Sequence, residues 1–373
     1  MRVGILFEYS TLNGGERSML AAIDGMGSER PEIIAIGLPY GPLADELRKR
    51  SIEIIPLSFF GEDSKRLPRD QTAGSIAEAT RDLGLDVLHA NSLSMGVLCG
   101  ELRSPAFVRV AHIRDIMSLS QNAVRLLNQT DRLLAVSQAT QQYHVAQGVD
   151  ANRVTVLHNG VDCTQFQPQV YPRTLHRELR IAENRLLSLT VGQIGLRKGL
   201  EVLVEAICDI GWRLPDLDFA IAGQRSSSKQ ESIEYEQNLY RLLEENQMGG
   251  RVHWLGYRTD VAHLMNEANM LVHVAHQEPL GRVLLEAAAS ALPIVATKVG
   301  GTEEILKQDE SALLVDKGNA NQVASAIAKL AGSPALRTRL GTAARNVIEE
   351  RFLASDAARQ LREHWVAASE RRS

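Results

Sequence analysis

Two glutamates frame the segment whose residue types could do the most chemistry. Glu278 and Glu286 stand eight positions apart around Pro279 and Gly281. An apolar helical pattern begins near Gly281, which predicts that Glu278 lies in the preceding loop and Glu286 about one and a half turns inside the helix. The first N–H groups of such a helix are unpaired and attract phosphate or another anion.

Carboxylates so placed could accept hydrogen bonds from hydroxyl groups in front of the helix and beside it. A ligand with a diphosphate between two polyhydroxylated groups, such as a nucleotide sugar, would fit this arrangement. The alternative is an ordinary solvated helix start, at which the helix dipole favours glutamate.

The segment 192–199 adds glycines and two cations ahead of another predicted helix. Arg197 and Lys198 directly precede Gly199. Lysine as a point charge and arginine as a fork both neutralise phosphate oxygens. The P-loop pattern GxxxxGK[ST] is not present. A diphosphate clamp and a basic helix start on the surface both remain open.

Two pairs of adjacent glycines also precede predicted helices. Gly14 and Gly15 follow the first predicted strand, where paired glycines let the backbone approach an anion or a sugar. Their spacing does not match the GxGxxG dinucleotide fingerprint. Gly300 and Gly301 follow a later strand, with Thr302 predicted as the N-cap of a helix. Capping accounts for this helix start, and the second pair of glycines again suggests that a ligand approaches the backbone closely.

Histidines stand near the ends of three predicted strands. His112 lies just past the predicted strand 107–111 and two residues before Arg114, while His89 and His158 occupy similar edges. Ligands bind at the carboxyl ends of parallel strands, so His112 is a candidate cleft residue. A structural hydrogen-bonding role is the alternative. No His, Cys and Asp residues have metal-site spacing, and neither GxSxG nor a Ser-His-Asp pattern occurs.

Short β-rich apolar runs alternate with helical patterns along the chain, which is typical of parallel sheets wrapped by helices. The alternation lapses over 159–185, a predicted linker, and then restarts. The sequence therefore predicts an α/β fold of two doubly wound domains facing across a cleft, with a helix over Asp356–Glu370 packing back on the first. The predicted strands are Val3–Phe7, Glu32–Ile36, Ile52–Pro56, Val87–Ala90, Phe107–Ala111, Arg132–Val136, Val154–Leu157, Leu186–Val191, Asp218–Ala222, Val252–Leu255, Met270–His273 and Pro293–Thr297. The predicted helices are Ser18–Met26, Gly41–Arg50, Thr72–Leu83, Ser137–Gln147, Gly199–Asp209, Tyr235–Gln247, Ala262–Glu267, Gly281–Ala291, Ala320–Leu330 and Pro334–Glu350.

Composition narrows the class of protein. The 373 residues are 44% hydrophobic with a formal charge of −4, which argues against a dedicated nucleic-acid binder. No apolar run is long enough to span a membrane, and three widely spaced cysteines indicate a reduced, cytoplasmic compartment. The basic clusters 48–50 and 65–69 are candidates for contact with anionic lipid or an acidic acceptor, with a solvated surface as the alternative.

Taken together, these segments resemble the retaining family 4 glycosyltransferases (glycosyl transferases group 1), which have the GT-B fold. The resemblance covers nearly the whole chain, and the Glu278–Glu286 segment with its continuation to Gly301 is its most specific part. The matching segments are Gly14–Glu16, Asp86–His89, the region of His112, Asn159–Asp162, Gly192–Gly199, Glu278–Glu286 and Gly300–Glu304.

The resemblance implies roles for the residues of the second glutamate segment. Glu286 would accept hydrogen bonds from the ribose hydroxyls of the donor. Glu278 would hold hydroxyls of the transferred sugar, with the backbone amides of Leu280 and Gly281 near the donor.

It also implies roles for residues outside that segment. Lys198 would balance the charge of the diphosphate. Family members usually carry arginine where Gln193 stands, so we expect Arg197 to supply part of the missing charge. Gly14 and Gly15 would let the first domain's loop approach the phosphates, and His112 would contact the sugar near the reacting carbon.

The resemblance finally implies an activity and a division of labour. Residues 1–165 would bind an acceptor of unknown identity through its hydroxyl. Residues 166–355 would bind the UDP- or GDP-sugar donor. Residues 356–373 would form the helix that packs back on the first domain. Sugar transfer would retain the anomeric configuration without an obligatory metal, in the synthesis of a cell-surface polysaccharide or glycoconjugate at or near the inner face of the membrane. The alternatives are a non-catalytic nucleotide-sugar-binding subunit and a sugar-nucleotide epimerase of the same fold.

Overall fold

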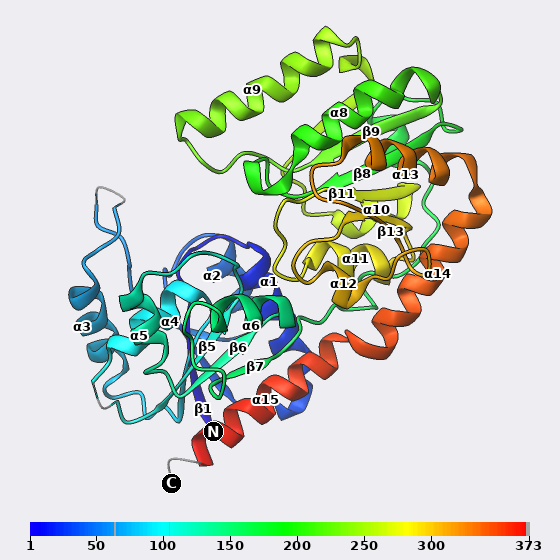
Figure 1. The fold of residues 1–373 in the computed structure, drawn as a ribbon. Coiled ribbons are helices and arrows are strands. Elements are labelled where there is room, and N and C mark those ends of the chain that lie inside the picture. The colour runs from blue at the N-terminus through cyan, green and yellow to red at the C-terminus, as the bar shows by residue number, and fades with distance from the viewer. Residues whose placement is uncertain (63–64, 104, 371–373) are drawn as a thin grey trace. The chain divides into compact units, whose positions relative to one another are not determined.

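The computed structural model describes residues 1–62, 65–103 and 105–370, and these form two compact units (Figure 1). The first unit consists of Met1–Gly160 together with the C-terminal segment from Ala354, and the second of Val161–Leu353. Residues 161–165 were expected in the first domain but belong to the second unit, where the Val161 N–H donates to the carbonyl of Phe352 at 2.9 Å.

A parallel sheet forms the centre of the first unit. Its order is β3-β2-β1-β4-β5-β6-β7, so the direction of winding reverses between β1 and β4, the place where such sheets bind ligands. The strands are β1 Arg2–Leu6, β2 Glu32–Gly37, β3 Glu53–Pro56, β4 Val87–Ala90, β5 Val108–Ile113, β6 Arg132–Ala135 and β7 Val154–Val156. The helices are α1 Gly14–Gly25, α2 Pro42–Lys49, α3 Arg69–Thr80, α4 Leu93–Glu101, α5 Gln121–Leu127, α6 Gln138–Val145 and α15 Ala354–Glu370.

Both faces of this sheet are buried, which explains the nearly continuous apolar runs of its strands. Successive side chains of a strand point to opposite faces. Ile5 therefore packs in a cluster with residues of α1 and α15, whereas Leu6 packs in the cluster of α3 and α4.

The C-terminal helix α15 is part of the first unit and lies beside α1 (Figure 1). A β-carbon on Gly25 of α1 would come within 2.8 Å of the carbonyl oxygen of Ala354, so only glycine allows this approach. Trp365 of α15 is fully buried in the same cluster as Ile5. The helix therefore contributes to the core of the first unit.

The second unit is also built on a parallel sheet, of order β10-β9-β8-β11-β12-β13. Its strands are β8 Leu186–Val191, β9 Leu217–Ala222, β10 Val252–Gly256, β11 Met270–His273, β12 Ile294–Thr297 and β13 Leu313–Val315. Its helices are α7 Thr174–Glu178, α8 Leu200–Ile210, α9 Gln230–Glu245, α10 Val261–Glu267, α11 Arg282–Ala289, α12 Thr302–Ile305, α13 Ala320–Gly332 and α14 Pro334–Arg351.

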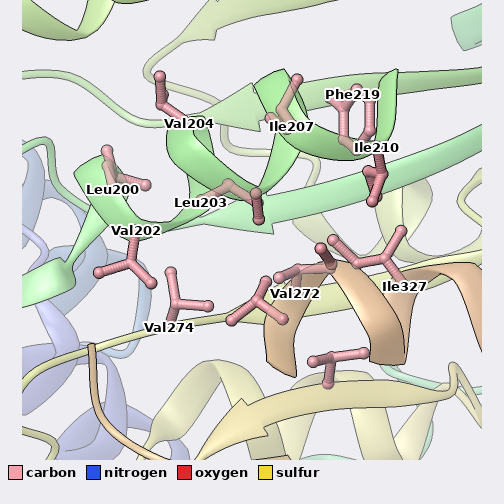
Figure 2. Packing of buried hydrophobic residues seen from close by; sticks show 14 of the residues in the cluster. Leu200, Val202, Leu203, Val204, Ile207, Ile210, Phe219, Val272, Val274 and Ile327 are labelled. Atoms are coloured by element: carbon pink, nitrogen blue, oxygen red, sulfur yellow. The ribbon is translucent and has the colours of Figure 1, made fainter. Parts of the chain in front are cut away.

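The core of the second unit fixes α8 over the sheet. Figure 2 shows Val202 and Leu203 of α8 directed toward Val272 and Val274, with Ile327 of α13 beside them. All five side chains are at least 96% buried. This packing holds the start of α8, and with it the loop 192–199, at the carboxyl edge of the sheet.

All predicted strands are present within two residues of their expected ends, but several helices differ. The helix α1 begins at Gly14 and not at Ser18, α4 and α5 were not predicted, and neither was β13. The predicted linker 159–185 is wrong in part, because it contains α7 and the fully buried Leu175. Thr302 is not an N-cap, since Gly301 occupies that position and Thr302 is the first helical residue.

Candidate functional site

Two loops of the second unit meet at the carboxyl ends of β8 and β11. The His276 N–H donates to the carbonyl of Arg197 at 2.9 Å, and the Arg197 guanidinium donates to the carbonyl of Gln277 at 3.1 Å. Gly199 has a φ of +64°, and a β-carbon there would lie 2.2 Å from the carbonyl oxygen of Val274. The loop after β8 is thus fastened to the loop after β11.

Glu278 lies where these loops meet and is 7% exposed. Its Oε2 accepts from Lys198 Nζ at 2.7 Å and from His273 Nε2 at 2.9 Å. Arg197 Nη1 lies 3.9 Å from Oε1. The sequence-predicted residues Glu278, Lys198 and Arg197 are therefore brought together.

These contacts determine the charges at the junction. Burial by itself would raise the pKa of Glu278, but Lys198, the hydrogen bond from His273 and the charge of Arg197 hold that pKa well below its usual range. Burial, with the charge of Lys198 second, lowers the pKa of His273. The carboxylate is therefore ionised and the imidazole neutral, donating through Nε2.

Gln193 does not join this group. Its side-chain amide donates to Ser226 Oγ in the loop after β9. Gly192, by contrast, lies against the Lys198 side chain, since a β-carbon there would be 3.5 Å from Lys198 Cε. Lys198 and Arg197 are consequently the two loop cations near Glu278.

Helix α11 begins directly after Glu278. Gly281 has a φ of +101° and is the N-cap without a side-chain cap, and Leu280 before it is 1% exposed. Glu286 is 7% exposed, and its Oε1 accepts from Arg282 Nε at 2.5 Å. The double-glycine loop before α12 also supports this region, because the Gly301 N–H donates to the carbonyl of Glu278 at 3.1 Å.

His112 belongs to a separate polar group in the first unit. The sequence analysis predicted it just past the end of the strand, but it lies within β5. Its side chain is buried, with 3% of the residue exposed. Its Nδ1 lies 2.9 Å from His89 Nε2 and 3.1 Å from Arg114 Nη2. Burial, followed by the charge of Arg114, lowers the pKa of His112 well below the usual value.

Arg114 connects this histidine to the start of α1. Its guanidinium donates to Asn159 Oδ1 at 2.8 Å, to Asn91 Oδ1 at 3.0 Å and to the Asn91 carbonyl at 3.2 Å. A β-carbon on Gly15 would lie 3.1 Å from Arg114 Cδ, whereas one on Gly14 would meet nothing within 4 Å. Gly15 therefore makes room for Arg114, and Gly14 borders open space.

Acidic groups complete the carboxyl edge of the first sheet. Glu8 is 4% exposed and accepts from Ser92 Oγ at 3.0 Å and from Arg66. Glu16 accepts from the Asn13 N–H at 3.1 Å as part of a capping box, and burial raises its pKa.

Sequence reasoning did not assign the supporting residues His273, Glu8 and Asn91. Each stands at the carboxyl end of a strand or just beyond it, in β11, β1 and β4. A buried strand that ends in a polar residue is the signal that could have found all three.

Three further features concern metal binding, membrane spans and the basic cluster 48–50. Within the described residues, no three His, Cys, Asp or Glu side chains are grouped so that they could hold a metal ion, and no helix has both the length and the apolarity of a membrane span. In the basic cluster 48–50, Arg48 pairs with Asp45, Lys49 with Glu46 and Arg50 with Asp24 and Glu46. Its charge is thus matched by neighbouring carboxylates.

Comparisons with known proteins agree with this architecture. The model of Glycosyltransferase Family 4 matches residues 12–165, and that of Glycosyl transferases group 1 matches residues 173–347. The D-inositol 3-phosphate glycosyltransferase of Pseudarthrobacter chlorophenolicus is 26% identical over 313 residues, which are 75% of this chain and 73% of that protein. The lipopolysaccharide core biosynthesis glycosyltransferase LpsE of Rhizobium meliloti is 31% identical over 152 residues, 41% of each chain.

Among solved structures, Alr3699/HepE of Anabaena in complex with UDP-glucose is similar in fold. Its TM-score is 0.85 at 22% identity, over 98% of this chain and 100% of that chain. With the two parallel-sheet units described above, this likeness confirms the predicted fold class.

Proposed function

Since the chain belongs to the family 4 glycosyltransferases, we propose that it moves a sugar from a nucleoside-diphosphate donor to an acceptor hydroxyl with retention of the anomeric configuration. The observation that carries this proposal is the cluster of Lys198, Arg197 and Glu278 next to the start of α11. It offers cations for a diphosphate and a buried carboxylate for hydroxyls within one small region.

Lys198 and Arg197 stabilise the leaving group in this proposal. The bond between the anomeric carbon and the phosphate oxygen breaks, and the electron pair stays with the diphosphate. Cations aimed at that developing charge lower the barrier, and the start of α11 adds its dipole. The acceptor oxygen bonds to the anomeric carbon on the same face, and its proton passes to the departing phosphate.

Glu278 orients the sugar through its free oxygen. Oε2 already accepts two hydrogen bonds, from Lys198 and His273, whereas Oε1 accepts none from a described residue. An ionised carboxylate in a buried position is a strong hydrogen-bond acceptor for sugar hydroxyls. Glu286 takes the ribose hydroxyls in the same proposal, held in place by Arg282.

Arg197 supplies the second positive charge that Gln193 lacks. Arg197 reaches the same carboxylate as Lys198, while Gln193 is turned to Ser226. We expect R197A to weaken donor binding about tenfold, the usual worth of one exposed charge-assisted contact. Q193R in the R197A background should restore part of that affinity; a double variant no better than R197A would contradict this assignment.

The two units divide the substrates in this proposal. The second unit binds the donor, and the first binds the acceptor and contributes His112. HepE of Anabaena was solved with UDP-glucose, which supports UDP-sugars as the first donors to test. The name of LpsE supports acceptors of the glycoconjugate class. Catalysis needs no metal ion here, and the protein acts in the cytoplasm or at the inner face of the membrane.

The test is a panel of UDP-, GDP- and ADP-sugars, first for thermal stabilisation and then for turnover with and without EDTA. We expect one donor class to raise the melting temperature and to be consumed, with an α-linked product from an α-linked donor by NMR. Inversion at the anomeric carbon, loss of activity in EDTA, or stabilisation without any turnover would each overturn the corresponding part of the proposal. Formation of an epimerised nucleotide sugar would identify the epimerase alternative.

A further inference from the structure

An indole from the C-terminal helix lies next to the polar group of the first unit. Trp365 of α15 is fully buried, and its Nε1 lies 2.9 Å from His89 Nδ1. The two rings meet edge to face with centroids 5.6 Å apart. The contact joins residues 276 positions apart in the sequence.

This contact determines where the proton of His89 resides. An indole N–H only donates, so His89 Nδ1 is the acceptor and carries no hydrogen. A neutral His89 then has its proton on Nε2, which lies 2.9 Å from His112 Nδ1. His89 therefore donates to His112.

Arg114 is a second donor to the same nitrogen of His112. A guanidinium has no acceptor, so Arg114 Nη2, 3.1 Å from His112 Nδ1, must also donate to that nitrogen. Two donors share one ring nitrogen, which consequently has no proton of its own. The proton of His112 is on Nε2.

Protonation of either ring would break this arrangement. A cationic His89 would point an N–H at the indole N–H, and a cationic His112 would point one at Arg114. Burial, with the charge of Arg114 second, lowers the pKa of His89 to about 3 and agrees with two neutral rings.

The remaining nitrogen of His112 has no hydrogen-bond partner among the described residues. Nε2 is not among the described side-chain atoms that are both closed off from solvent and without a hydrogen-bond partner. It therefore has some access to solvent from a residue that is 3% exposed. A single N–H donor is presented near the carboxyl end of β5.

We propose that Trp365 and His89 are positioning residues that fix His112 as the neutral tautomer with its proton on Nε2, so that this N–H can donate to an oxygen of the bound substrate. The relay from Trp365 through His89 to His112 is a property of the first unit alone. Only the destination of the N–H rests on the proposed function.

The tautomer is read directly by NMR of the full-length protein labelled with 15N-histidine. Signals of the two rings are assigned by their loss in H89Q and H112Q. We expect both rings to show a protonated Nε2 and an unprotonated Nδ1 from pH 5.5 to 8. His112 with its proton on Nδ1, or a doubly protonated ring in this range, would overturn the proposal.

W365F keeps an aromatic ring and removes the N–H. His89 Nδ1 then has no donor, so we expect a second set of signals with Nδ1 protonated. A spectrum with the wild-type tautomer alone would show that Trp365 does not fix the proton. If W365F does not fold, H89Q and H89F test the next link: the glutamine amide can accept from Trp365 and donate to His112, whereas phenylalanine can do neither.

Kinetics separate positioning from packing. We expect W365F and H89F to lower kcat about tenfold, the worth of one neutral hydrogen bond, with KM changed less than twofold. H89Q should restore most of the rate. L361V, in the same helix and core cluster, is the control: it should lose stability but keep kcat. Equal kcat losses in L361V and W365F would show that packing of the helix, and not the hydrogen bond from Trp365, determines the rate.

The spectra and the kinetics can fail separately. A confirmed tautomer together with full activity in H112Q would leave the relay intact and refute the role of His112 in the proposed function. A wrong tautomer would refute the relay whatever the activity.

Discussion

Glu278 is the residue at which the charged side chains of the second unit's candidate site meet. It is ionised although buried, because Lys198, His273 and Arg197 surround it. Removing any one of these partners should lower the stability of the protein, since it leaves the buried charge of Glu278 with less compensation.

Three variants separate the roles of the charged residues. We expect K198A and E278A to lower kcat about 100-fold, because each removes a group that is proposed to act on the charge or the sugar in the transition state. E286A should mainly raise the dissociation constant of the donor. K317A, an exposed lysine elsewhere in the second unit, is the control and should change neither. Steady-state kinetics and donor titration measure both quantities, and full rate and affinity in all three variants would refute the site.

The buried histidines predict how stability depends on pH. The folded pKa values of His89 and His112 are lowered, so the unfolded chain binds more protons below about pH 6.5. The stability that these two neutral histidines contribute is therefore complete above that pH and is lost as the pH falls. At pH 5.5 each histidine should lower the free energy of unfolding by about 1.4 kcal/mol relative to its value well above pH 6.5. Urea denaturation followed by Trp365 fluorescence, with Trp212 and Trp254 changed to phenylalanine, should show a shallower pH dependence in H89Q. Identical slopes would contradict the assignment.

Much of the second unit's site could be predicted from residue types, and less of the first. The glutamates, Lys198 and Arg197 are recognisable because they stand beside helix starts. The partnership of His89 with Trp365 could not be predicted, because it depends on how a distant helix packs on the sheet. His273 was counted as a strand residue, and only the bend of the loop after β11 brings Glu278 back to it.

At the scale of elements, glycines determine how closely the loops of the site pack. Gly199 combines a left-handed φ of +64° with contact to the Val274 carbonyl. Gly195, in the same loop, has an extended backbone and nothing within 4 Å of an added β-carbon. These two positions form a matched pair for a test.

We expect G199A to lose at least about 2 kcal/mol of stability and to weaken donor binding, because the loop after β8 must move away from β11. G195A should change either quantity little. Thermal melts and titration with the preferred donor measure both effects. If G199A and G195A behaved alike, the fastening of the two loops would not matter for binding.

Helix α4 shows why some elements could not be predicted. Its sequence is apolar on several sides and contains Gly96 and Gly100, so it lacks a clear helical period. The structure explains both glycines: β-carbons there would lie 2.8 Å from Ala111 Cβ and 2.1 Å from the Leu126 carbonyl. Close packing on two sides outweighs the poor helix propensity of glycine.

At the scale of the whole molecule, the first unit is assembled from two distant parts of the chain. Residues of α15 fill its core beside β1 and α1, and Trp365 is the largest of them. The second unit is continuous in sequence.

Replacing Trp365 by alanine should therefore affect one unit. We expect W365A to lose about 3–5 kcal/mol, as for other buried tryptophans, and to increase hydrogen exchange in β1, β4 and α1. Exchange in β8, β9 and α8 should stay as in the wild type. Equal loss of protection in both sheets would show that the units unfold as one.

The divided first unit also orders events during synthesis. Trp365 is translated after all of the segment 161–353, so the N-terminal sheet lacks one side of its core until α15 has been made. His89 has no donor from Trp365 during that interval. In the proposed relay, the histidine in β5 can acquire its final tautomer only after α15 has been translated and has packed against the sheet.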